Sequence, residues 1–281
     1  MRLANKIGCH NEYDRLKEVI VTSPTYMRIE KVINQTQKYY QNDNIDVDKA
    51  LEQHRYFLKV MRDHGVRVIE IEADPTLNEQ VFTRDIGMTI GDQVFVAEMA
   101  TELRQREIIH FNQLLDEQNI PHQAIQVDSI EGGDVIVDGE TIWVGISGRT
   151  TKKASKALQQ LLPDYQIETI YLADEILHLD CTLNLVSGET ALIYPDGIGE
   201  ADYQKLRSRY QCIDVDHDEQ FTLGTNVLSI EAGKVISLPE NKRTNRKLRE
   251  AGFEVIEVPF NEIIKSGGSF RCCTMPVWRE K

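Results

Sequence analysis

The sequence predicts an α/β fold in which five similar units close on themselves like the blades of a propeller. Two short β-branched strands, a helix and a further strand recur along the chain. The residues that open the units follow at steady spacings of 49, 46, 46 and 46 residues, and they are Asp85, Asp134, Asp180, Asn226 and Cys272. A unit repeated at a fixed interval is typical of closed repeat architectures. We therefore expect one domain over residues 1–281, in which the repeat-opening residues converge on a common axis.

The N-terminal quarter supplies a first strand, a helix and a second strand. The β-branched run at 19–22 predicts a strand, and apolar residues at helical spacing predict a helix over 46–64. Gly65 ends this helix before a strand at 66–71. The stretch 24–45 is rich in Tyr, Gln and Asn, and we interpret it as a helix broken by a mobile loop that is a candidate lid.

Four hairpins with glycine in their turns follow. They are expected at 85–96, 134–145, 180–193 and 225–238. The helices between them are expected at about 102–118, 150–162 and 241–251, each followed by a strand, at 121–127, 166–171 and 253–258. The last strand, at 274–278, would pair with the strand at 19–22 and so remove exposed edges. The alternative is a doubly wound α/β sheet in which the acidic residues merely occupy turns.

Composition narrows the class of protein. Of 281 residues, 41% are hydrophobic and 27% charged, as in an ordinary globular protein. The chain has no apolar run near the roughly 20 residues that span a bilayer, and Met1–Ile7 has no apolar signal-peptide core. We therefore expect a cytoplasmic protein without membrane contact. The net charge of −13 argues against a nucleic-acid surface, whereas a cationic small substrate and a homo-oligomer stay open.

The five cysteines, an odd number without CxxC spacing, argue against a disulfide scaffold or a zinc site. Cys272 and Cys273 follow Gly267-Gly268, which leaves the backbone open to a substrate, and Arg271 adds positive charge. A nucleophilic thiolate favours such a partly exposed, electropositive site. The alternative is that both cysteines are buried as small hydrophobic residues, which is common in cytosolic proteins.

Several upstream residues could serve such a thiol. His178, at a strand opening, can exchange protons near neutral pH. Asp85 and Asp180 could pair with a planar cation, because a carboxylate matches two guanidinium N–H donors. Glu131 and Asp134 flank two glycines in a turn. One histidine with scattered acids is a poor metal set. The acidic run 214–218 lacks the glycine of a calcium loop, so we interpret it as a solvated turn.

Four short motifs in this order resemble the guanidino-group modifying superfamily. They are Phe82-Thr83-Arg84-Asp85, Glu131-Gly132-Gly133-Asp134, His178-Leu179-Asp180 and Gly267-Gly268-x-x-x-Cys272-x-Thr274. That superfamily comprises arginine deiminases, dimethylarginine dimethylaminohydrolases and amidinotransferases on a five-fold α/β-propeller. The resemblance covers nearly the whole chain. The absence of an inserted helical domain and the Cys-Cys pair look most like the dimethylarginine dimethylaminohydrolase branch.

The resemblance implies a role for each matched residue. Cys272 would be the nucleophile, Cys273 a non-catalytic neighbour, and His178 the general acid and base. Glu131 would hold the guanidinium and support His178. Substrate-binding residues would be Asp85, Asp180 and Asp134, with Arg104 and Arg149 binding an α-carboxylate.

The implied reaction is hydrolysis of arginine or N-methylated arginine through a covalent S-alkylthiouronium. It gives citrulline plus ammonia or an amine, with neither a metal nor an organic cofactor. Asp180 is typical of deiminases and amidinotransferases, and Arg271 stands where deiminases usually have histidine, so the substrate stays open. The rival interpretations are an amidinotransferase with an amine acceptor, and a propeller that binds a guanidino ligand or a structural partner without turnover.

Overall fold

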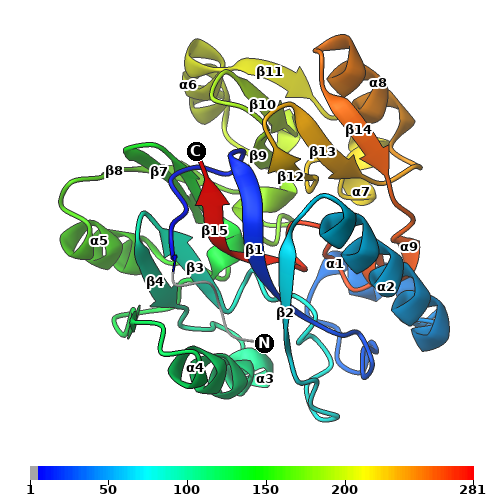
Figure 1. The fold of residues 1–281 in the computed structure, drawn as a ribbon. Coiled ribbons are helices and arrows are strands. Elements are labelled where there is room, and N and C mark those ends of the chain that lie inside the picture. The colour runs from blue at the N-terminus through cyan, green and yellow to red at the C-terminus, as the bar shows by residue number, and fades with distance from the viewer. Residues whose placement is uncertain (1–5) are drawn as a thin grey trace.

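The computed structural model describes residues 6–281, and in this range the strands form five three-stranded sheets arranged as blades (Figure 1). Each blade has an antiparallel strand pair and a third strand that runs parallel to the middle one. The five-fold α/β-propeller expected from the repeat interval is therefore confirmed. Residues 1–5, on which most of the prediction about a signal-peptide core falls, lie outside the described residues.

The first blade joins the two ends of the chain. Its middle strand, β1 (Arg15–Thr22), pairs antiparallel with β15 (Met275–Glu280) and parallel with β2 (Arg67–Ile71). Ile20 lies opposite Met275, so the blue and red strands run side by side in Figure 1. The predicted pairing of the last strand with the first is confirmed. It closes the ring by joining the two ends of the chain within one blade.

The other blades follow in chain order. Their strands are β3 (Gly87–Ile90), β4 (Gln93–Val96) and β5 (His122–Ala124); β6 (Val135–Asp138), β7 (Thr141–Ile146) and β8 (Gln166–Tyr171); β9 (Leu183–Leu185), β10 (Thr190–Ile193) and β11 (Gln211–Asp214); and β12 (Leu228–Glu231), β13 (Lys234–Ser237) and β14 (Glu254–Glu257). The expected hairpins are all present. Their first strands begin one to three residues later than expected, because the repeat-opening residues lie in turns.

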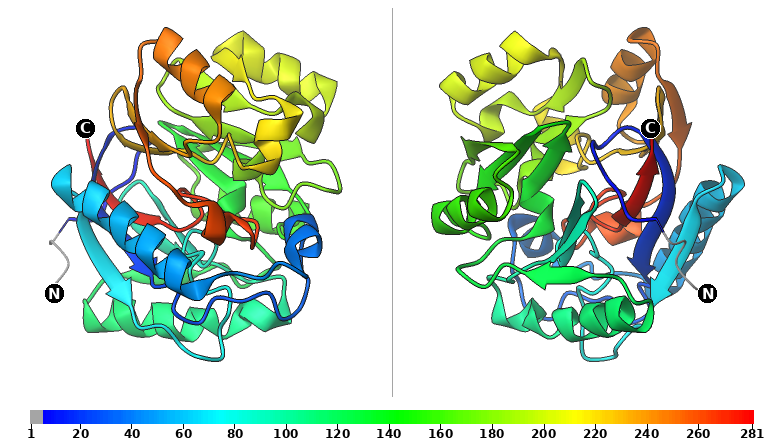
Figure 2. Two further views of the ribbon diagram at one scale, coloured as in Figure 1. Left: turned by 90° about the vertical axis from the view of Figure 1, so that its right-hand side faces the viewer. Right: turned by 60° about the vertical axis from the view of Figure 1, so that its left-hand side comes forward.

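Helices on the outside of the ring carry the chain from each middle strand to the third strand (Figure 2). They are α2 (Val47–Asp63), α3 (Glu102–Gln105), α4 (Glu107–Glu117), α5 (Lys152–Leu161), α6 (Glu200–Arg209) and α8 (Lys242–Glu250). Short helices α1 (Gln35–Tyr40), α7 (His217–Phe221) and α9 (Asn261–Ile264) lie in the connections. None of the helices within residues 6–281 has the length and apolar character needed to cross a membrane.

Two local expectations are wrong. The helix expected at about 102–118 is interrupted at Arg106, which separates α3 from α4. The acidic run 214–218 is not a simple turn, because it ends β11 and begins α7. Acidic residues in the first turn of a helix are stabilised by the backbone N–H groups there, and Asp218 and Glu219 occupy that turn of α7.

Repeat-opening residues lie in turns directly before the first strand of each blade, including the 3-10 turns Gly132–Asp134 and Leu179–Cys181. Among the described residues, hydrogen bonds join these turns into a closed circle. The donor and acceptor pairs are Gly132 N–H to Asp85 O, Leu179 N–H to Asp134 Oδ1, Asn226 Nδ2 to Asp180 O, Cys272 N–H to Asn226 Oδ1 and Arg84 N–H to Cys272 O. The repeat therefore brings distant residues to one axis.

An aromatic cluster anchors the turn that carries the cysteines. Phe270 stacks on Phe260 with ring centroids 4.6 Å apart, and Phe57 of α2 lies 5.2 Å from both rings. All three side chains are at most 1% exposed. Packed aromatic side chains lose little freedom to move. The backbone two residues before Cys272 is therefore held rigidly.

Candidate active site

Cys272 lies in a tight turn that packs closely against Phe82, and this packing is possible because Gly268 has no side chain. A Cβ at Gly268 would lie 2.3 Å from Cε1 of Phe82 and 3.0 Å from Cβ of Cys272. The Cys272 N–H donates to Oδ1 of Asn226 at 3.2 Å. The thiol Sγ lies 3.8 and 3.7 Å from the two carboxylate oxygens of Asp180. The nucleophile candidate therefore points at a carboxylate near the axis.

The thiol is more enclosed than the sequence suggested. Cys272 is 3% exposed, so the expectation of a partly exposed thiol is wrong for this state. The positive charge of Arg271 is taken up by Asp180, whose Oδ2 lies 3.1 Å from its guanidinium. Burial, and then the negative charge of Asp180, raise the pKa of Cys272 well above its ordinary value. Without a cationic ligand the residue is a neutral thiol.

Cys273 follows Cys272, and both side chains belong to the same hydrophobic core. It is fully buried, and its N–H donates to the Ser269 carbonyl oxygen at 3.0 Å. Burial raises the pKa of its thiol well above the ordinary value. Of the two cysteines, Cys272 lines the cavity described below, and Cys273 is not among the residues that line it.

His178 is held between two carboxylates. Its Nε2 lies 2.8 Å from Oε2 of Glu131, and its Nδ1 lies 3.6 Å from Oδ1 of Asp85. Burial opposes the charged imidazolium, but Asp85, the Glu131 hydrogen bond and Asp134 outweigh it and raise the pKa of His178 to about 10. Although burial acts against it, the contact with His178 lowers the pKa of Glu131. At neutral pH the pair is an imidazolium and a carboxylate.

Asp85 and Arg104 form a buried ion pair at one wall of the site. The Arg104 guanidinium lies 2.6 Å from Oδ2 of Asp85 and 2.8 Å from Oε2 of Glu107, and it also donates to the Phe82 carbonyl oxygen. Oδ1 of Asp85 is buried and has no hydrogen-bond partner in the described part of the chain. A buried acceptor without a partner is costly. This oxygen is therefore poised to accept an N–H from a ligand.

Asp134 takes up a supporting place under His178. One of its oxygens accepts from the Leu179 N–H at 2.8 Å, and the other accepts from the Ser147 hydroxyl at 2.7 Å. Burial raises the pKa of Asp134 to about 6. Asp134, which we expected to bind the substrate, thus has both carboxylate oxygens bonded within the protein, and it fixes the turn that carries His178.

A small cavity of about 10 Å³ joins most of the predicted residues. Its lining includes Asp85, Arg104, Arg149, His178 and Cys272, whereas Glu131, Asp134 and Asp180 lie behind this lining. A volume of this size holds about one water molecule. An amino-acid substrate can therefore enter only if part of the wall moves.

That wall is the segment before and within α1, part of the candidate lid at 24–45. Ile33 and Asn34 line the cavity, and Nδ2 of Asn34 donates to the Ser266 carbonyl oxygen at 2.9 Å. Arg149 crosses to the same segment, because its guanidinium donates to the Ile33 carbonyl oxygen at 3.2 Å. It also lies 3.6 Å from Glu131, at the border between the cavity and a surface cleft of about 370 Å³.

Glu79 is a cavity residue that the sequence reasoning missed. Its carboxylate accepts from Nε2 of Gln37 at 2.8 Å and from the Ser266 hydroxyl at 3.0 Å. Burial raises the pKa of Glu79 to about 7, although Arg104 acts in the opposite direction. In the sequence Glu79 stands in a polar loop without periodicity, and only its closeness to the Phe82 motif could have drawn attention to it.

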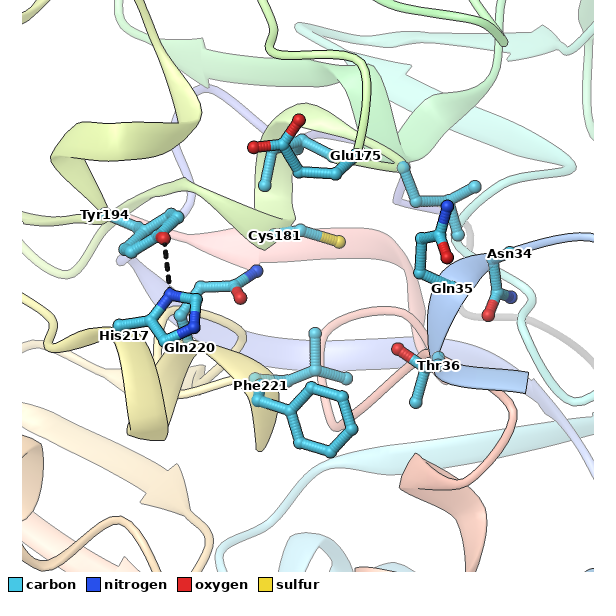
Figure 3. Close-up of a pocket in the computed structure, with 13 residues that line it drawn as sticks. Asn34, Gln35, Thr36, Glu175, Cys181, Tyr194, His217, Gln220 and Phe221 are labelled. Carbon is cyan, nitrogen blue, oxygen red and sulfur yellow. Dashed lines mark hydrogen bonds between the residues drawn. The ribbon is translucent and has the colours of Figure 1, made fainter. Parts of the chain in front are cut away.

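A second pocket of about 240 Å³ adjoins the cavity across Asn34, Leu177 and Gly267, which line both. In Figure 3, Tyr194 and His217 lie on one side of this pocket, joined by a 2.8 Å hydrogen bond, and the α1 segment lies opposite. The segment before α1 therefore separates the buried cavity from open space on two sides.

The side chains of Asp85, Glu131 and His178 lie close enough to hold a cation, with ligand atoms within 4.8 Å of one another. The structure uses these atoms in other ways, because Glu131 binds His178 and Asp85 binds Arg104. With an imidazolium at its centre, the set is arranged to transfer a proton. Together with the Cys272 thiol, the carboxylates can enclose a planar cation next to a nucleophile.

The five-bladed fold, with acidic residues, a histidine and a cysteine at the blade openings, is that of the guanidino-group modifying superfamily. The family described as "N,N dimethylarginine dimethylhydrolase, eukaryotic" matches residues 23–279, and the chain belongs to this family.

Relatives and solved structures agree with this placement. The chain is 45% identical to the Bacillus subtilis protein YkgA over 98% of its length and 96% of that protein. It is 28% identical to arginine deiminase of Bacillus thuringiensis, over 95% of this chain and 75% of the deiminase. The amidinotransferase SxtG from Microseira wollei superimposes with a TM-score of 0.85 at 20% identity, covering 98% of both chains. The N-terminal domain of the cyanobacterial arginine dihydrolase ArgZ, bound to substrate, also gives 0.85, at 22% identity and over 93% and 98% of the two chains.

Proposed function

We propose that this protein is a cysteine hydrolase of guanidino substrates, acting on arginine or N-methylated arginine. The observation that carries the proposal is a small cavity lined by Cys272, Asp85 and His178, with Asp180 in contact with the thiol and Glu131 in contact with the imidazole. The match to the dimethylarginine family and the arginine deiminase relatives support a guanidino substrate.

Substrate binding would use the carboxylates of the site. A guanidinium stays cationic at any physiological pH, and its N–H groups fit Oδ1 of Asp85, which lacks a hydrogen bond within the described residues, and the carboxylate of Asp180. Entry of this cation would also favour ionisation of Cys272, because the charges attract. The thiolate fraction of Cys272 would therefore rise when a substrate binds.

Chemistry would follow in two balanced halves. The Cys272 thiolate attacks the central guanidinium carbon, and the bond from that carbon to the departing nitrogen breaks as His178 donates its proton. This leaves a covalent S-alkylthiouronium, a free amine or ammonia, and a neutral imidazole. His178 then takes a proton from water, whose oxygen attacks the same carbon and displaces the sulfur. The proton left on the new hydroxyl group passes to the departing sulfur, so the products are a ureido compound such as citrulline and the restored Cys272 thiol.

The far end of the cavity suits the amino-acid part of a substrate. Arg149 lies where the cavity meets the surface cleft, and it can bind a carboxylate. Glu79 can accept an ammonium group in place of Gln37 and Ser266. Arg104 is bound by Asp85 and Glu107, so its part would be to orient Asp85 as well as to attract a carboxylate.

The test is to incubate the protein with arginine, asymmetric dimethylarginine and agmatine and to assay ureido product. We expect product from at least one of them, and none from a Cys272→Ala variant. Product that forms only when glycine is added as an amine acceptor would show an amidinotransferase instead. Tight binding without product from any guanidine, with or without an acceptor, would show a non-catalytic binding protein.

A further inference from the structure

Arg271 is a buried bridge between two carboxylates from distant parts of the chain. One guanidinium nitrogen lies 3.1 Å from Oδ2 of Asp180, and the other lies 3.1 Å from Oε1 of Glu12. The second nitrogen also donates to the Val135 carbonyl oxygen at 3.1 Å. The Arg271 side chain is 2% exposed, so water cannot replace these partners. Its position is set by the carboxylates at its two ends.

Glu12 belongs to the segment before β1 and is itself enclosed. Besides Arg271, it accepts from the Val137 N–H at 3.3 Å, and its Oε2 lies 3.7 Å from the Arg84 guanidinium. Burial opposes ionisation of Glu12, but Arg271 and Arg84 outweigh it and lower the pKa of this carboxyl. Glu12 and Arg271 do not line the substrate cavity. Their contact with the site runs through Asp180.

The contacts of Arg271 reach the candidate nucleophile through Asp180. The Asp180 oxygen that faces Arg271 is also 3.7 Å from Sγ of Cys272. Arg271 therefore offsets the charge of Asp180 next to the thiol, and Glu12 offsets the charge of Arg271. Other titratable groups around Cys272 and Asp180 include Glu79, Arg84, Asp85, Arg104, His178, Cys181 and Cys273. Coulomb interactions between buried groups at these distances are weakly screened.

We propose that Glu12, through Arg271, is a positioning residue that sets the orientation and the charge balance of Asp180 at Cys272. This inference rests on the proposed function, since it concerns how the site holds a cationic guanidine beside a neutral thiol. With Glu12 ionised, the site stays negative enough to attract the cation. Without that charge, the excess of positive charge at Arg271 would stabilise a thiolate and weaken binding of the cation.

The test compares two substitutions that remove opposite charges from one ion pair. The rate of Cys272 alkylation by iodoacetamide is followed at one mildly alkaline pH, with each cysteine peptide quantified by mass spectrometry. We expect Glu12→Gln to speed labelling of Cys272 by about tenfold and Arg271→Gln to slow it by a similar factor. We also expect Glu12→Gln to raise KM for the guanidine substrate more than it lowers kcat.

A matched control is Glu219→Gln. Glu219 is also a buried carboxylate, but it accepts hydrogen bonds from the N–H groups of Arg243 and Thr244 and is not part of the Glu12–Arg271–Asp180 contacts. This substitution should leave Cys272 labelling unchanged. A purely structural role for Glu12 would instead expose the buried thiols Cys9 and Cys273 together with Cys272.

Labelling of Cys272 in folded Glu12→Gln at or below the wild-type rate would overturn the inference. If that variant does not fold, labelling of Arg271→Gln at or above the wild-type rate would do the same. Alkylation needs no turnover, so the two proposals can fail separately. If Glu12→Gln speeds labelling and Arg271→Gln slows it, but the protein makes no ureido product, the proposed hydrolysis is wrong and the role of Glu12 is retained.

Discussion

Replacing Glu131 by Gln removes the charge that holds His178 as an imidazolium and keeps a side chain of the same shape. Oε2 of Glu131 lies 2.8 Å from Nε2 of His178, and both side chains are at most 1% exposed. Burial acts against the charge, yet the neighbouring carboxylates raise the pKa of His178 from 6.5 to about 10. By the usual conversion this rise is roughly 5 kcal/mol in favour of the imidazolium, to which Glu131 contributes the one direct hydrogen bond.

We therefore expect Glu131→Gln to lower the pKa of His178 and to deprive the leaving amine of its proton donor. General acid catalysis contributes about 100- to 10,000-fold, so kcat should fall within that range. The pH at which kcat falls on the alkaline side should move to lower pH in the variant, because its His178 would lose the proton more easily. Rates of ureido product formation across a pH series measure both effects, with thermal unfolding as the control for folding. A folded variant with near wild-type kcat and an unmoved alkaline limb would refute this account of His178.

Three further outcomes can be checked with the same assays. The neighbouring carboxylates stabilise the folded protein by favouring protonated His178; this contribution is complete below pH 6.5 and is lost as the pH rises through about 10. In urea unfolding, the difference in unfolding free energy between wild type and Glu131→Gln should therefore shrink across that pH interval. Cys272→Ala should abolish turnover, whereas Cys273→Ala should keep most of it and lose about 1 kcal/mol of unfolding free energy; the reverse pattern of activity would reassign the nucleophile. Gly268→Ala places a Cβ 2.3 Å from the Phe82 ring, so it should cost about 1–3 kcal/mol in thermal unfolding and most of the activity, and an unaffected variant would contradict the close approach seen there.

Much of the architecture could be predicted because it is repeated locally. Each blade is a hairpin, a helix and a strand with its own turn and periodicity. The regular interval between the repeat-opening residues from Asp85 to Cys272 was therefore enough to predict the closed fold. Errors arose where local patterns compete. The break at Arg106 separates two helices that share one apolar pattern, and the acidic run 214–218 suits both a turn and the first turn of α7.

Candidate site residues could be named from short motifs, but their contacts could not. Asp134 shares a motif with Glu131, yet its oxygens support the His178 turn and do not line the cavity. Glu79 and Glu12 carry no motif, and each reaches the site only because the blades bring a loop or the N-terminal segment against it.

The sequence by itself determined the five-fold repeat, its closure by the two ends of the chain, and the set of chemically capable residues at the repeat openings. These follow from spacing and residue type, which are properties of the chain alone. Only the tertiary structure decided that Cys272 is buried against Asp180, that His178 lies between Glu131 and Asp85, and that Arg271 bridges Asp180 and Glu12. Charge state depends on burial and on partners a few ångströms away, and those partners come from segments that are distant in the sequence.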